Sequence, residues 1–168
     1  TVSGSTVELT LTTTVKNDEA VTVAYTDPSG SDDANAIQDS SGNDVATLIS
    51  TSVTNNSTVA GTPPTFSSAA TNTAGTKVIL TYNETLSATT AATSAFAVTT
   101  GGSSNSVTDV AISGSTVELT LTTTVKNDEA VTVAYTDPSG SDDANAIQDS
   151  SGNDVATLSS TSVTNNST

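Results

Sequence analysis

The sequence predicts an all-β protein built as an antiparallel β-sandwich of about seven strands, arranged in tandem modules. Thr alternates with Val and Leu over many short stretches, a period of two that is typical of half-buried strands. Turns rich in Gly, Asn, Asp and Ser separate these stretches at short spacing. The chain also repeats itself, because residues 1–58 return as residues 111–168 with three differences: Thr1/Ala111, Val2/Ile112 and Ile49/Ser159.

The two copies are offset by 110 residues. That period is longer than the repeating unit of a solenoid and fits a string of separate domains. The segment 59–64, Val-Ala-Gly-Thr-Pro-Pro, is expected to be a stiff extended linker, because its prolines cannot join a central strand. We therefore expect residues 65–168 to form a complete module and residues 1–58 to be the C-terminal half of a preceding one.

The strands of the complete module follow from the alternation, taken in chain order. Residues 113–115 form the tight turn of a hairpin, residues 101–105 form an open turn, and residues 88–94 fit either a helical turn or a loop. The predicted strands cover residues 65–70, 77–82, 96–99, 107–112, 116–122, 130–136 and 155–165. Short strands of this number, each with one polar face, are typical of an immunoglobulin-like (Ig-like) β-sandwich.

Composition excludes several classes of function. The 168 residues include 18 acidic and 3 basic side chains, a net charge of -15, with no Cys, Met, Trp or His. Nucleic acids and anionic membrane surfaces both require basic patches, so neither is an expected partner. The absence of His and Cys removes the usual catalytic triads, thiol nucleophiles and zinc sites, so we do not expect an enzyme. No apolar run is long enough to span a bilayer, and membrane insertion is not expected.

An acidic stretch at residues 137–154, repeated unchanged at 27–44, is the strongest candidate site. Carboxylates this dense, with no Lys or Arg among them, repel one another unless a cation lies between them. Oxygen ligands on a flexible loop suit Ca²⁺ better than Mg²⁺. The predicted calcium ligands are Asp137, Asp142, Asp143, Asp149, Asn153 and Asp154, with Asp27, Asp32, Asp33, Asp39, Asn43 and Asp44 in the first copy.

An alternative interpretation is that the stretch is a solvated acidic connector, since Asp, Ser, Gly and Asn are all turn formers. The spacing does not follow the EF-hand pattern. Ile147 interrupts the polar run, however, which indicates that the loop folds back and anchors one apolar side chain.

Several ordered segments resemble the tandem repeat of SwmB-type bacterial Ig-like proteins, which are giant cell-surface proteins of cyanobacterial swimming motility. The segments are residues 64–69 (Pro-Thr-Phe-Ser-Ser-Ala), 75–82 with Leu86, 113–121, 131–137 and 147–154. The resemblance extends over the complete module and the partial one. It implies a secreted protein of tandem modules at the cell surface, without catalytic residues.

We expect a non-catalytic structural repeat of a long extracellular or fibre-forming protein, stabilised by calcium. The alternative is a calcium-dependent adhesin module that binds a surface glycan or protein. The expected partners are neighbouring modules or identical chains. Residues 1–58 hold only the last strands of a sandwich, so either a neighbouring chain completes them by strand complementation or an earlier part of the same array does so.

Overall fold

The computed structural model describes all residues, 1–168, and the chain forms two compact units, Thr1–Ala60 and Gly61–Thr168. All regular structure is β apart from one short 3-10 turn, η1 (Thr93–Ala95). That turn is the only helical element, and it is far too short to cross a membrane.

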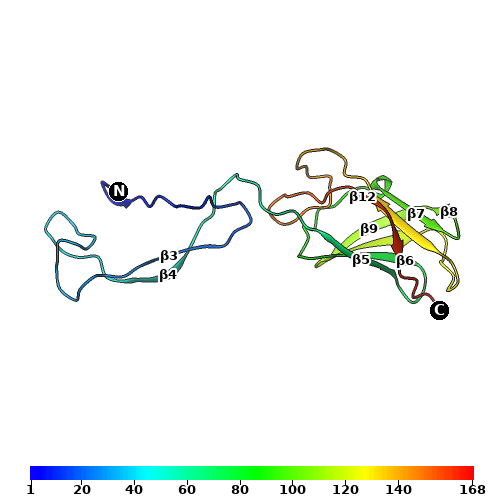
Figure 1. Cartoon of the computed structure of the whole chain (residues 1–168), viewed down its shortest axis with the longest axis horizontal. Coiled ribbons are helices and arrows are strands. Elements are labelled where there is room, and N and C mark those ends of the chain that lie inside the picture. The colour runs from blue at the N-terminus through cyan, green and yellow to red at the C-terminus, as the bar shows by residue number, and fades with distance from the viewer. The chain divides into compact units, whose positions relative to one another are not determined.

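The second unit is a sandwich of two four-stranded antiparallel sheets (Figure 1). One sheet has the order β5-β6-β10-β9 and the other β12-β11-β7-β8. The strands are β5 (Phe66–Thr71), β6 (Lys77–Tyr82), β7 (Phe96–Thr100), β8 (Ser103–Asn105), β9 (Val107–Ser113), β10 (Thr116–Leu121), β11 (Val131–Tyr135) and β12 (Leu158–Val163). The predicted all-β sandwich is thereby confirmed, with eight strands in place of about seven.

The additional strand lies in the segment 101–105, for which the sequence predicts only an open turn. Gly101 and Gly102 make the turn with positive φ angles, and Ser103–Asn105 then pairs with β7. Residues 88–94, which fit either a helical turn or a loop, form a loop that runs into η1. The last strand is shorter than the predicted 155–165 at both ends, because it runs only from Leu158 to Val163.

One hydrophobic core lies between the two sheets. Alternate residues of β6, β10 and β11 are buried, among them Leu80, Leu119 and Val133, all fully inaccessible. This is the period-two pattern that the sequence predicts for strands with one buried face. The rings of Phe96 and Tyr135 pack within the same core with their centroids 5.3 Å apart.

The first unit contains two separate two-stranded sheets. In one, β1 (Val2–Ser3) pairs with β2 (Thr6–Val7); in the other, β3 (Val21–Tyr25) pairs with β4 (Leu48–Val53). The pair β3–β4 runs side by side in Figure 1. No residue of this unit is buried, so it has no core of its own.

Candidate metal centre

The acidic loop 137–154 connects β11 to β12 and is held by its one large apolar side chain. Ile147 is fully buried, and its backbone amide donates a hydrogen bond of 3.0 Å to the Tyr135 hydroxyl at the end of β11. The amide of Val155 donates to the Ile147 carbonyl over 2.7 Å. Burial raises the pKa of Tyr135 to about 12, so this hydroxyl stays protonated at neutral pH. The fold-back that Ile147 indicates is confirmed.

Three of the predicted ligands come together in this loop. Asp137, Asp143 and Asp154 each offer a carboxylate oxygen, and these oxygens lie within 4.8 Å of one another. Asp142 lies beside them, where its Oδ1 accepts a hydrogen bond of 3.2 Å from the Asp154 amide. Residues separated by 17 positions thus converge on one point, an arrangement that spacing alone does not reveal.

Asp149 and Asn153 form a separate structure within the loop. Asn153 Nδ2 donates to Asp149 Oδ2 over 2.7 Å, and Asp149 Oδ1 accepts from the amides of Ser151 and Asn153. These bonds close a turn whose glycine, Gly152, has a φ of 86°. The two side chains therefore serve the local turn and are not among the three converging carboxylates.

Asp154 and Asp143 have opposite electrostatic environments. Asp154 is only 9% exposed; its Oδ2 accepts from the Asp143 amide over 2.7 Å, but its Oδ1 is buried without a hydrogen-bond partner. Burial raises the pKa of Asp154. Asp143 instead accepts hydrogen bonds from the Ser139 hydroxyl and the Asn145 amide, which lower its pKa. The cluster therefore combines Asp143, whose carboxylate is stabilised by hydrogen bonds, with Asp154, whose Oδ1 is buried without one.

The first copy repeats the arrangement with one informative difference. Asp27, Asp33 and Asp44 again place their oxygens within 4.8 Å of one another, Asp32 Oδ1 accepts from the Asp44 amide, and Asn43 donates to Asp39 over 2.7 Å. The difference lies in the glutamine of the loop. Gln38 Nε2 donates to Asp44 Oδ1 over 2.8 Å, whereas Gln148 Nε2 donates to the Asp143 carbonyl. The carboxylate oxygen left free in one copy is paired in the other.

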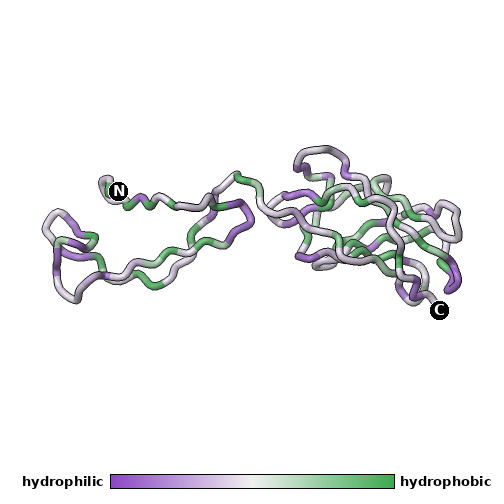
Figure 2. The backbone as a smooth tube through the Cα atoms, viewed as in Figure 1, coloured by the Kyte–Doolittle hydropathy of each residue, from purple (hydrophilic) through white to green (hydrophobic).

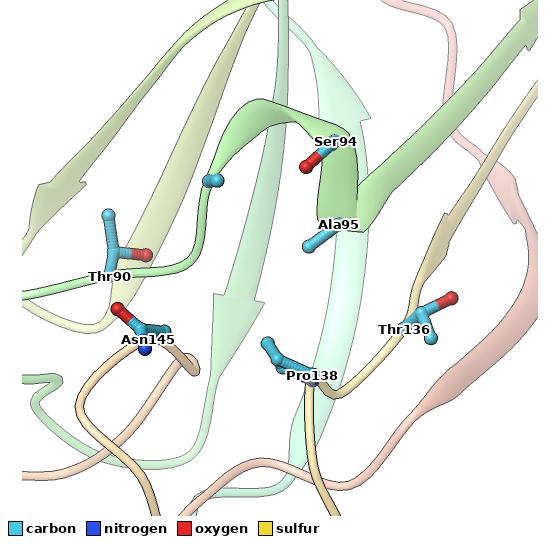
Figure 3. A pocket seen from close by; sticks show the side chains of 7 residues that line it. Thr90, Ser94, Ala95, Thr136, Pro138 and Asn145 are labelled. Atoms are coloured by element: carbon cyan, nitrogen blue, oxygen red, sulfur yellow. The ribbon is translucent and has the colours of Figure 1, made fainter.

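An open pocket of about 480 Å³ borders the acidic loop (Figure 3). Its lining contains no charged and no aromatic side chain, and the acidic loop contributes Pro138 and Asn145 to it. The remaining lining residues are Thr90, Ala92, Ser94, Ala95 and Thr136. Small polar and apolar side chains of this kind offer no stacking surface for a sugar ring.

Fold and loop together define a tandem Ig-like β-sandwich repeat with an acidic loop between its last two strands. The chain belongs to the SWM_repeat family, described as "Putative flagellar system-associated repeat", which matches residues 1–30 and 59–140. This match includes Asp137 but not Asp143 or Asp154. The swimming-motility type of repeat that the sequence resembles is thereby confirmed at the level of the family.

A solved structure of a bacterial surface-layer (S-layer) protein shares the fold. The N-terminal part of the bacterial S-layer protein SbsC matches 62% of this chain with a TM-score of 0.50 and 21% identity, and the match covers 24% of that chain. A structure of the S-layer protein rSbsC matches 61% of this chain with a TM-score of 0.48 and 20% identity, over 14% of that chain. No curated protein sequence matches the chain. At 21% identity the likeness to the N-terminal part of SbsC concerns the fold alone.

Proposed function

We propose that the chain is a non-catalytic structural repeat of a long extracellular, cell-surface protein of the swimming-motility type, and that calcium stabilises its modules. The observation that carries the calcium proposal is the buried Oδ1 of Asp154, which lacks a partner beside Asp137 and Asp143. A buried carboxylate oxygen without compensation is costly, and a bound cation removes that cost.

The donor set favours a hard cation. Every candidate ligand is an oxygen, and Ca²⁺ binds carboxylate and carbonyl oxygens at about 2.3–2.6 Å with flexible geometry. Three carboxylates balance the positive charge of the ion, and Asp142 adds a fourth beside them. Small loop movements would bring oxygens now within 4.8 Å of one another around one ion.

A mechanical role is supported by the repetition itself. The repeated segment presents the same surface twice in this chain, and a net charge of -15 keeps like modules apart in solution. A cation that binds the folded module and not the unfolded chain stabilises each link by an amount that grows with the logarithm of the ion concentration above its dissociation constant. An extracellular location is consistent with this use, because calcium is abundant there.

Ion binding is tested by terbium luminescence on the full chain, with Tyr135 and Tyr25 as the donors that sensitise a Tb³⁺ ion in each loop. We expect two ions per chain. Asp143→Asn with Asp154→Asn should leave one, and adding Asp33→Asn with Asp44→Asn should leave none. Asp109→Asn with Asp128→Asn changes the net charge equally outside the loops and is the matched control. Equal emission from the control and the loop variants would overturn the proposal.

The adhesin alternative is tested separately. A glycan array probed with the full chain in calcium should show no selective binding if the module is only structural. The pocket beside the acidic loop would be the first place to mutate if a glycan bound, with Asn145→Ala as the variant.

A further inference from the structure

The same apolar side chains are exposed in the first copy of the repeated segment and buried in the second. Leu9 is 62% exposed, whereas its equivalent Leu119 is fully buried. Val7 and Leu11 are likewise exposed, while their equivalents Val117 and Leu121 lie in the core. Because the residues are identical, composition does not explain the difference. What differs is whether other strands pack against these side chains.

The uncovered side chains form an apolar groove within the first unit. It has a volume of about 270 Å³, and its lining includes Val7, Leu9, Val23, Tyr25, Ile37 and Val45. Figure 2 shows hydrophobic segments along the pair β3–β4 as well as in the strands of the second unit. All six equivalents of these residues in the second unit are core residues.

The second unit shows what covers this surface. Strand β6 pairs along β10 with Leu80 opposite Val117 and Val78 opposite Leu119. Strand β7 pairs along β11 with Val98 opposite Val133 and Phe96 opposite Tyr135. Both covering strands come from residues 61–110, which lie outside the repeated segment.

We propose that the groove of Thr1–Ala60 binds a polypeptide with the sequence of residues 61–110, which adds strands to β2 and β3 and closes a second sandwich. The register follows from the complete unit: Leu9 lies opposite Val78, and Val23 opposite Val98. Phe96 of the bound polypeptide then covers Tyr25. This interaction goes beyond the proposed function and does not depend on calcium.

The partner is a half-period that lacks its own second half, rather than a second intact copy of this chain. In an intact chain, residues 61–110 are joined covalently to residues 111–168, which present the same surface as the groove. An intramolecular competitor of this kind acts at a high effective concentration, so an intact copy does not release the segment.

The test adds a fluorescently labelled peptide of residues 61–110 to the full chain and follows anisotropy and amide hydrogen exchange, with calcium and with chelator. We expect saturable binding of one peptide per chain. We also expect new protection of the amides of Val21–Tyr25 and of residues 8–11. Ile49→Ser is the matched control, because Ile49 is 80% exposed and the complete copy has Ser159 at that position.

Two substitutions probe the interface from its two sides. Leu9→Asp in the chain, and Leu80→Asp in the peptide, should each weaken binding by more than about tenfold, because each buries a charge among apolar side chains. The peptide variant leaves the chain unaltered, so a folding defect in the chain cannot account for its effect. Absence of binding, or equal affinity for all variants, would overturn the proposal. So would dimerisation of the chain alone that protects the same amides, since a second copy would then be the partner.

Discussion

The Oδ1 atom of Asn153 accepts a hydrogen bond of 3.0 Å from the backbone amide of Gly61, the first residue of the second unit. Asn153 is 1% exposed, and its Nδ2 atom donates to Asp149. The acidic loop is therefore hydrogen-bonded to the residue at which the second unit begins. Because Asp154 follows Asn153 directly, an ion bound at Asp154 would order the residue that holds Gly61.

Asn153→Ala should destabilise the second unit by about 1–3 kcal/mol, because it removes one buried and one partly buried hydrogen bond and leaves the Asp149 carboxylate short of a donor. Urea unfolding of the full chain measures this free energy. Asn43→Ala is the matched control, since Asn43 makes the same bond to Asp39 at an exposed position. A loss from Asn43→Ala as large as that from Asn153→Ala would contradict this assignment.

Asp154→Asn should stabilise the calcium-free chain by about 1 kcal/mol, because it replaces a buried carboxylate by a neutral group that can still accept from the Asp143 amide. The gain depends on pH. Burial raises the pKa of Asp154 above its ordinary value of 3.8, so the parent carries this cost only when Asp154 is ionised. The two proteins should differ most near neutral pH and become equal as the pH falls through the raised pKa towards 3.8. A parent that is more stable than the variant near neutral pH would show that the buried oxygen is compensated.

Removal of calcium with a chelator should lower the melting temperature of the full chain at matched ionic strength. An ion that binds the folded loop and not the unfolded chain would add its free energy of binding to that of folding. Asp143→Asn with Asp154→Asn should abolish the response of the second unit. Matched salt is essential, because general screening also relieves repulsion among the carboxylates. Superimposable melting curves with and without chelator would count against a stabilising ion.

Gly75→Ala should cost at least about 1–3 kcal/mol of stability from backbone strain alone. Gly75 has a φ of 68°, and a Cβ atom there would collide with the Val125 carbonyl oxygen. Its own carbonyl also accepts a hydrogen bond of 2.8 Å from the Val125 amide. Gly140→Ala is the control, since Gly140 lacks a positive φ and has open space around it. Thermal unfolding of the two variants decides the point, and equal melting temperatures would contradict the predicted clash.

The candidate site was only partly predictable from the sequence. Ile147 as an anchor could be predicted, because one apolar residue in a polar loop has to be buried somewhere. Which aspartates form the cluster could not be predicted. Asp149 bonds locally to Asn153, whereas Asp137, Asp143 and Asp154 converge across the loop. Five aspartates at irregular spacing do not reveal which of them bond to nearby backbone amides.

Local structure was determined by the sequence itself, because it appears in both copies whether or not a sandwich surrounds it. The pair β3–β4 has the same register and the same bulge as β11–β12. Tyr25 accepts from the Ile37 amide over 3.0 Å, as Tyr135 does from Ile147. These contacts join residues that are close in sequence, so one segment contains all the partners they need.

Only the tertiary structure decided how long the strand becomes that follows the Ser-Gly-Ser turn, which is at residues 3–5 in the first copy and 113–115 in the second. Residues 116–121 form β10 between β6 and β9, but in the first unit the equivalent strand β2 ends at Val7. A strand requires hydrogen-bonded neighbours, and its apolar face requires an opposite sheet. Leu119 has both and is buried, whereas Leu9, with the same sequence around it, has neither and is exposed.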